Sequence, residues 1–175
     1  MRYMITNKTR ISKNSQLLKP DFILFRDKNC DDYAQRALNF LKNSKDFRAK
    51  LFLHNDYDLA LKLGADGVHF STLNIANIAK APKNLIKIAS THSEYELRAA
   101  CDLGVNFITF SPIFASPNKG EPKGIKALEY IIKIAKNYGV GVFGLGGILE
   151  NSQIEEILNT GACGFASIRY FEKMS

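Results

Sequence analysis

The segment Leu63-Gly64-Ala65-Asp66-Gly67-Val68 carries the pattern that decides the fold. The end of a helix is followed by a glycine at a C-cap position and then by a short apolar run, which is typical of a buried strand. The same pattern recurs at Leu103-Gly104-Val105-Asn106-Phe107-Ile108 and at Thr160-Gly161-Ala162-Cys163-Gly164-Phe165. One helix–strand unit is therefore repeated along the chain.

Eight short apolar runs along the chain are candidate strands. They are Arg2–Thr6, Phe22–Arg26, Lys50–His54, Gly67–Phe70, Ile86–Thr91, Phe107–Ile113, Gly141–Gly146 and Gly164–Arg169. Between most of them the apolar residues have helical spacing, at Asp31–Leu41, Tyr57–Leu63, Leu73–Ala79, Glu94–Leu103, Ile125–Asn137 and Ser152–Asn159. Continuous apolar strands that alternate with helices indicate a parallel sheet covered by helices.

This alternation predicts an α/β protein, a (β/α)8 barrel formed by residues 1–175 as a single domain. Such barrels usually have roughly 250 residues, whereas this chain has 175. The shortfall lies at the two ends, because residues 7–21 carry no clear helix and few residues follow Arg169. We expect a compact barrel whose first and last helices are shortened or missing, with a doubly wound open sheet as the alternative.

The charge balance narrows the class of partner. The 24 Lys and Arg residues exceed the 17 Asp and Glu residues, for a formal net charge of +7, and such an excess attracts nucleic acid, an acidic membrane surface or a phosphorylated small molecule. The lysines are scattered, without a basic arm, and no apolar run is long enough for a membrane span. Three widely spaced cysteines suit a reduced compartment. We therefore expect a cytoplasmic protein that binds phosphorylated small molecules, and neither nucleic acid nor membrane.

Cations follow two of the predicted strands. In a parallel α/β barrel the chemistry lies where the strands end. Arg26 and Lys28 leave one strand at alternate positions, and Lys119 follows another in a loop rich in Ser, Pro and Gly. Three cations on one rim predict a clamp for phosphate or pyrophosphate. Surface solvation is the alternative for each lysine taken alone.

Oxygen ligands and glycines follow two other strands. Asn55-Asp56 places an amide beside a carboxylate, which suits Mg2+, although either residue could cap a helix instead. Gly146 and Gly147 open a helical region, where backbone N–H groups can approach an anion, although tight turns need glycine as well.

The histidines are too far apart in the sequence to nominate a metal site. His69 lies within an apolar strand and is expected to be a core histidine with its hydrogen bonds satisfied. His92, in Ser90-Thr91-His92-Ser93, is a candidate substrate contact.

Taken together, these motifs resemble the family of thiamin phosphate synthase and the TenI-like thiazole tautomerases. The segments that carry the resemblance are Leu24–Lys28, Asn55–Ala60, Leu63–His69, Ser90–Ser93 with Glu96, Ser111–Phe114 leading to Lys119, and Gly144–Ile148. The resemblance implies a (β/α)8 barrel in which the synthase joins a hydroxymethylpyrimidine pyrophosphate to a thiazole phosphate and releases pyrophosphate.

The resemblance also implies a role for each matching residue. Pyrophosphate would be held by Arg26, Lys28, Asn55 and Lys119. Asp56 would bind Mg2+, Ser90 would face the reacting groups, and Gly146 and Gly147 would donate N–H groups to the thiazole phosphate. The catalytic candidates are thus Arg26, Lys28, Ser90 and Lys119, and the candidate substrate-binding residues are Asn55, His92, Ser116, Asn118, Gly146 and Gly147.

Several residues depart from the synthase pattern. Asn74 stands in place of a second metal carboxylate, a change that would weaken Mg2+ binding. The loop before Lys119 has Ser116 and Asn118 in place of two threonines, and Arg169 replaces a serine. A TenI-like tautomerase carries a catalytic histidine where this chain has Pro112, which has no titratable group.

We therefore expect a synthase-like transferase that uses Mg2+. The alternatives are a tautomerase and a catalytically silent relative that binds phosphorylated ligands. Missing helices at the barrel seam would also leave apolar surface for a subunit partner to cover, which predicts a homodimer.

Overall fold

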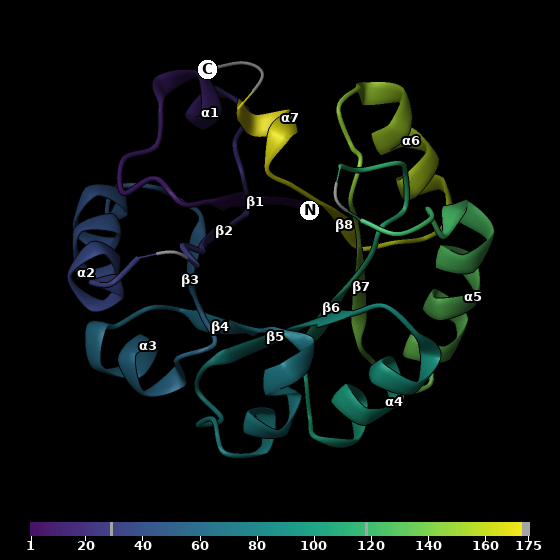
Figure 1. Ribbon diagram of the computed structural model, residues 1–175, viewed down its shortest axis with the longest axis horizontal. Coiled ribbons are helices and arrows are strands. Elements are labelled where there is room, and N and C mark those ends of the chain that lie inside the picture. The colour runs from purple at the N-terminus through teal and green to yellow at the C-terminus, as the bar shows by residue number, and fades with distance from the viewer. Residues whose placement is uncertain (29, 118, 173–175) are drawn as a thin grey trace.

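The computed structural model describes residues 1–28, 30–117 and 119–172 and forms a closed barrel of parallel strands ringed by helices (Figure 1). The strands are β1 Arg2–Thr6, β2 Phe22–Phe25, β3 Lys50–His54, β4 Gly67–Phe70, β5 Ile86–Thr91, β6 Phe107–Phe110, β7 Gly141–Leu145 and β8 Gly164–Ser167. The helices are α1 Lys13–Leu17, α2 Tyr33–Ser44, α3 Tyr57–Leu63, the 3-10 helix η1 Thr72–Ala79, α4 Glu94–Asp102, α5 Gly124–Lys136, α6 Asn151–Asn159 and α7 Arg169–Glu172.

The strands follow one another around the barrel in sequence order, and β1 pairs in parallel with both β2 and β8. This closure confirms the predicted (β/α)8 barrel and excludes the open sheet. The end helices are short, as expected: α1 has five residues and α7 has four. They meet at the seam, where the Ser15 hydroxyl donates to the Phe171 carbonyl oxygen at 2.9 Å.

Two predictions about individual elements need correction. The segment 73–79 forms a 3-10 helix rather than an α-helix, with i to i+3 hydrogen bonds such as that from the Asn74 N–H to the Ser71 oxygen at 2.9 Å. Residues 7–21, expected to carry no clear helix, contain the single short turn of α1. Four strands end one to three residues before their predicted ends, because the chain leaves the ladder to form the loops of the barrel mouth.

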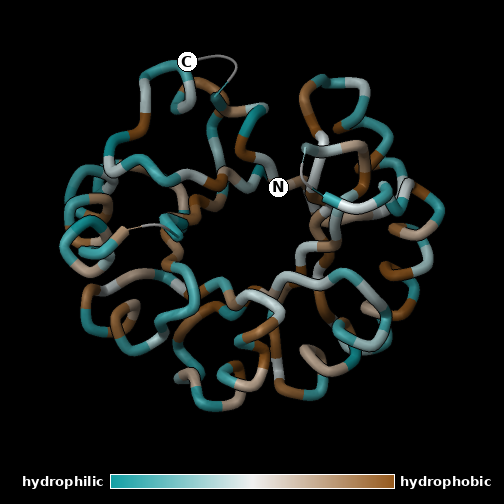
Figure 2. Tube along the Cα trace, in the orientation of Figure 1, coloured by the Kyte–Doolittle hydropathy of each residue, from teal (hydrophilic) through white to brown (hydrophobic). Residues whose placement is uncertain are grey.

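Apolar side chains form two separate layers. Inside the barrel, the aromatic rings of Tyr3, Phe22, Phe52 and Phe143 contact one another with centroids 4.9–5.9 Å apart. The larger cluster lies between the strands and the surrounding helices. Along the helices hydrophilic and hydrophobic residues alternate, as expected for helices with one face on the barrel (Figure 2). The lumen is therefore filled by side chains.

The repeated helix–strand unit has a physical basis. Asp66 and Asn106 precede β4 and β6, and their side-chain oxygens accept hydrogen bonds from the N–H groups of Leu51 and Lys87 on the preceding strands, each at 2.8 Å. Asp21 before β2 accepts from the Arg2 N–H in the same way, at 2.6 Å. These carboxylate and amide groups tie the amino ends of neighbouring strands together. In the described ranges no helix is long and apolar enough to span a membrane.

Candidate active site

Polar side chains line the carboxyl ends of the first half of the barrel. At alternate positions along the strands the side chains point into the lumen, as those of Leu24, Phe52 and Ile88 in the inner apolar layer do. The same alternation places Arg26 and His54 at the mouth, on neighbouring strands whose register pairs Phe25 with Leu53. Next to them, His69 on β4 pairs in register with His54.

The three predicted cations are brought together at this mouth. The pKa of Lys28 is lowered by the positive charge of Arg26, by burial and by the positive charge of Lys119. Arg26 is half-buried, and burial lowers its pKa. Among the described residues, none of the three forms an ion pair with a carboxylate. The neighbouring Asp27 is paired instead with Arg36 of α2 at 2.9 Å. The cluster therefore carries positive charge without a protein counter-ion, which favours an anionic ligand.

His54 belongs to this site, although the sequence pattern did not select it. Burial, followed by the charges of Arg26 and Lys28, lowers its pKa to about 4. It is therefore a neutral imidazole at pH 7, beside two cations. The signal that could have found it is its alternation with Phe52 along β3, which places it on the lumen side.

The loops after β3 and β4 are tied together by Asn55, Ser71 and Asn74. The Ser71 N–H donates to Asn55 Oδ1 at 2.7 Å, and Asn74 Nδ2 donates to the Ser71 hydroxyl oxygen at 2.9 Å. Asn55 has a positive φ of 62°, a conformation that asparagine tolerates better than most residues. Asn55 Nδ2 and Asn74 Oδ1 have no partner among the described residues. Asn55 Nδ2 can therefore donate a hydrogen bond to a ligand, and Asn74 Oδ1 can accept a hydrogen bond or coordinate a metal ion.

Asp56 caps helix α3. Its Oδ1 accepts a hydrogen bond from the Leu59 N–H at 2.8 Å, and its second oxygen is available at the surface. The described residues contain no group of three His, Cys, Asp or Glu side chains placed to hold a metal ion. Asp56 offers Mg2+ one carboxylate oxygen and Asn74 offers one amide oxygen. Phosphates of a substrate would therefore have to supply further ligands of the ion.

Ser90 lies at the end of β5, half-buried, and its hydroxyl is 2.8 Å from Nε2 of His69. The other ring nitrogen of His69, Nδ1, is 2.7 Å from the Tyr3 hydroxyl oxygen. The prediction that His69 is a core histidine with its hydrogen bonds satisfied is confirmed, and the residue it holds is a predicted catalytic one.

The predicted residues His92 and Ser116 lie on the loops after β5 and β6. His92 Nδ1 is 2.9 Å from the Ser111 carbonyl oxygen, and the His92 N–H donates to the Glu96 carboxylate. The contact with Ser111 joins the ends of β5 and β6, and the contact with Glu96 joins the loop after β5 to α4. Ser116 is half-buried, and its carbonyl oxygen accepts from the Lys119 N–H at 3.2 Å. The predicted residue Asn118 lies outside the described residues.

Gly146 and Gly147 follow β7 with φ values of 101° and 74°. An added Cβ at Gly146 would lie 2.9 Å from Pro112, and one at Gly147 would lie 2.6 Å from the backbone of Phe114. Close packing therefore requires both glycines. Their N–H groups donate to no acceptor in the described part of the chain, while their carbonyl oxygens accept from the Phe114 N–H and Gln153 Nε2. These N–H groups are the free donors that a phosphate needs.

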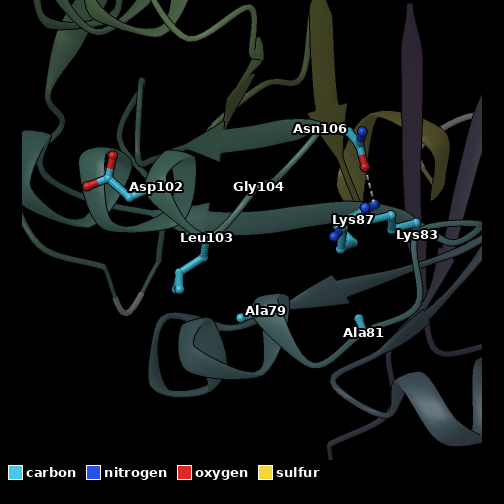
Figure 3. Close-up of a pocket in the computed structure, with 8 residues that line it drawn as sticks. All are labelled: Ala79, Ala81, Lys83, Lys87, Asp102, Leu103, Gly104 and Asn106. Carbon is cyan, nitrogen blue, oxygen red and sulfur yellow. Dashed lines mark hydrogen bonds between the residues drawn. The ribbon is translucent and has the colours of Figure 1, made fainter.

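A surface hollow of about 510 Å3 lies elsewhere (Figure 3). Its lining residues are Ala79, Ala81, Lys83, Lys87, Asp102, Leu103, Gly104 and Asn106. Lys87 and Asn106 mark the amino ends of β5 and β6, so the hollow is on the face of the barrel opposite the cation cluster. It is separate from the candidate active site.

Comparisons with known proteins agree with this architecture. A family model described as "Thiamine monophosphate synthase" matches residues 3–171. A "Thiamine-phosphate synthase" of Nostoc punctiforme is 34% identical over 151 residues, which are 83% of this chain and 42% of that protein. A "Thiamine-phosphate synthase" of Methanocella arvoryzae is 32% identical over 154 residues, 85% of this chain and 72% of that protein. The chain thus spans less than half the length of the Nostoc relative.

Among solved structures, the thiamine phosphate pyrophosphorylase from Pyrococcus furiosus superposes with a TM-score of 0.77 at 23% identity. The superposition covers 99% of this chain and 94% of that one. At this identity the likeness supports the barrel fold.

Proposed function

The chain belongs to the thiamine monophosphate synthase family, and from this premise we propose that it joins a hydroxymethylpyrimidine pyrophosphate to a thiazole phosphate and releases pyrophosphate. The observation that carries the proposal is the convergence of Arg26, Lys28 and Lys119 at one end of the barrel, where the pKa of Lys28 is lowered by Arg26, by burial and by Lys119. A cluster of cations that has no counter-ion among the described residues suits a pyrophosphate leaving group.

The chemistry follows from the charges. The transition state that the family resemblance implies has a pyrimidine carbocation parting from pyrophosphate, so negative charge grows on the leaving group. Fixed cations placed where that charge develops lower the barrier. Arg26 would supply a planar fork of donors, Lys28 and Lys119 point charges, and Asn55 Nδ2 a neutral donor. The free N–H groups of Gly146 and Gly147 would hold the thiazole phosphate.

Asp56 and Asn74 would hold Mg2+ together with the phosphates of the substrate. When bound, the ion would neutralise part of the pyrophosphate charge. Asn74 offers a neutral oxygen where a carboxylate would bind more tightly, so Mg2+ affinity should depend strongly on the substrate.

Incubation of the purified protein with both phosphorylated substrates and Mg2+ should give thiamin phosphate. Arg26→Met and Lys119→Met should each lower kcat/KM by about 10- to 100-fold, because each removes a charge-assisted contact. Lys133→Met, on the surface of α5 away from the mouth, is the matched control and should leave kcat/KM unchanged. Absence of product across a range of Mg2+ concentrations would refute the proposal.

A catalytically silent, ligand-binding relative is the second candidate, favoured by the neutral Asn74 and by the lack of an acidic metal cluster among the described residues. Thermal stabilisation by thiamin phosphate without turnover would favour it. A tautomerase would need a proton carrier where this chain has Pro112, which has no titratable group.

A homodimer and a cytoplasmic location remain predictions. Leu17 of α1 lies beside the seam with 75% of its surface exposed. In a homodimer a partner subunit would cover this apolar side chain. A monomeric mass by light scattering at micromolar concentration would count against the dimer.

A further inference from the structure

A line of three polar side chains crosses the largely apolar lumen of the barrel. Tyr3 on β1 is fully buried among Phe22, Phe52 and Phe143, and its hydroxyl oxygen is 2.7 Å from His69 Nδ1. On the other side of the imidazole, Nε2 is 2.8 Å from the hydroxyl oxygen of Ser90, which is half-buried at the mouth. The line therefore runs from the centre of the barrel to the candidate active site.

The buried members of this line are neutral. Burial, with smaller contributions from His54 and Arg26, lowers the pKa of His69 to about 3. Burial also raises the pKa of Tyr3 well above its ordinary value. A neutral imidazole carries one N–H, so one ring nitrogen donates and the other accepts.

The surroundings decide which ring nitrogen carries the proton. Within the described residues, the Tyr3 hydroxyl has no polar partner other than His69 Nδ1. If Nδ1 carried the proton, the Tyr3 O–H would be buried without an acceptor, which is costly. With the proton on Nε2, the Tyr3 O–H donates to Nδ1 and the Nε2–H donates to the Ser90 oxygen. The hydrogens of Tyr3 and His69 then both have an acceptor.

This arrangement leaves the hydrogen of the Ser90 hydroxyl available. Thr109, the register partner of Ser90 on β6, has a buried hydroxyl that makes no hydrogen bond with the described residues, so it does not take this hydrogen. The hydrogen bonds all run in one direction, and each donor polarises the next.

We propose that Tyr3 and His69 are positioning residues that fix the Ser90 hydroxyl so that its hydrogen is available to a ligand at the mouth of the barrel. The Ser90 hydrogen can then be donated to an acceptor atom of the ligand, such as an oxygen of a phosphate or pyrophosphate. The proposal depends on the proposed function only for the identity of that ligand. The direction of the hydrogen bonds is a property of the free protein.

The first test needs no substitution. In protein labelled with nitrogen-15 at histidine, the ring nitrogen shifts and their long-range couplings to the ring hydrogens identify the tautomer of His69 at pH 7. We expect a single neutral form with the hydrogen on Nε2. A form with the hydrogen on Nδ1 would overturn the proposal, whether or not the protein makes thiamin phosphate.

The second test measures binding of inorganic pyrophosphate by calorimetry. Tyr3→Phe keeps the ring in the aromatic layer but removes the hydroxyl, and it should weaken binding about fivefold, as loss of one hydrogen bond does. Ser90→Ala should weaken it by at least as much, and the double variant no further than Ser90→Ala. Tyr130→Phe, which removes a hydroxyl bonded to Glu94 at 2.7 Å on the surface, is the matched control and should bind normally.

The comparison of Tyr3→Phe with Tyr130→Phe also separates a positioning role from a general loss of structure. In Tyr3→Phe the His69 tautomer should become mixed, since no group then fixes it, while the tautomer in Tyr130→Phe stays unchanged. A Tyr3→Phe variant with a mixed tautomer but unaltered pyrophosphate affinity would overturn the link to Ser90. Additive losses in the double variant would overturn it as well.

Discussion

Replacing Asp56 separates its two expected roles, because the same carboxylate caps helix α3 and is proposed to hold Mg2+. Asp56→Ala removes the hydrogen bond from the Leu59 N–H, which is 2.8 Å long. Asp56→Ser keeps an N-cap oxygen but removes the charge, since serine is among the preferred N-cap residues. Both variants lack the metal carboxylate. The pair therefore distinguishes capping from metal binding.

The expected effects on stability follow from the structure. Loss of an N-cap costs about 1 kcal/mol, and loss of a negative charge at an exposed helix N-terminus costs about 0.3 kcal/mol more. For a chain of this size, 1 kcal/mol corresponds to a change in Tm of about 2–4 °C. Asp56→Ala should therefore lower Tm by about 4 °C, and Asp56→Ser by about 1 °C, in thermal melts followed by circular dichroism.

The two variants should differ in Tm but should not differ in their effect on Mg2+ binding. The affinity for inorganic pyrophosphate is measured by calorimetry with and without Mg2+. The ratio of the two affinities gives the contribution of Mg2+ to pyrophosphate binding. Mg2+ should strengthen binding to the unsubstituted protein, whereas Asp56→Ser and Asp56→Ala should lose this gain equally. If Asp56→Ser keeps the full Mg2+ effect, Asp56 is only a helix cap and the metal proposal is wrong.

Three further predictions concern the strength of Mg2+ binding, the pH dependence of stability and the packing of the barrel. Asn74→Asp adds a second carboxylate and should increase the Mg2+ effect on pyrophosphate affinity about tenfold, while Asn74→Ala should abolish it. Because His69 has a pKa of about 3 in the folded protein and about 6.5 when unfolded, its contribution to stability is present above pH 6.5 and is lost as the pH falls toward 3. Urea unfolding should show that the unsubstituted protein loses about 2 kcal/mol more than His69→Gln between pH 7 and pH 5, and equal losses would contradict the neutral histidine. Gly67→Ala would place a Cβ 2.2 Å from the Ile86 carbonyl oxygen and should cost about 3 kcal/mol or more, whereas Gly104→Ala, with open space around it, should cost about 1 kcal/mol for its positive φ.

The sequence predicted the barrel well because strand and helix periodicity are local properties. β1, β3, β4 and β5 have the predicted bounds, and the repeated unit around Gly64 recurs where α4 leads to β6 and where α6 leads to β8. Periodicity located the helix at residues 72–79 but not its type, since a short apolar segment has a similar pattern in a 3-10 helix and in an α-helix. Strand ends also failed by up to three residues, because pairing with a neighbour determines where a strand ends.

The candidate site was only partly accessible from the sequence. Arg26, Lys28 and Lys119 could be selected because cations after strands are visible in the sequence. The role of Asp56 as a cap was left open beside metal binding, and the hydrogen bond to Leu59 shows that the cap is real. His54 and Tyr3 were missed, because a single polar or aromatic residue inside an apolar strand carries no signal of what lies across the barrel.

By itself, the sequence determined that eight apolar strands alternate with helices, that the end helices are short, and which polar residues follow each strand. Tertiary structure alone decided which of these residues meet. Barrel closure places Tyr3, His69 and Ser90 on one line although they are 66 and 21 residues apart in the chain. It also brings Lys119 close enough to affect the pKa of Lys28. Long-range strand pairing sets these distances, and no local pattern of side chains records them.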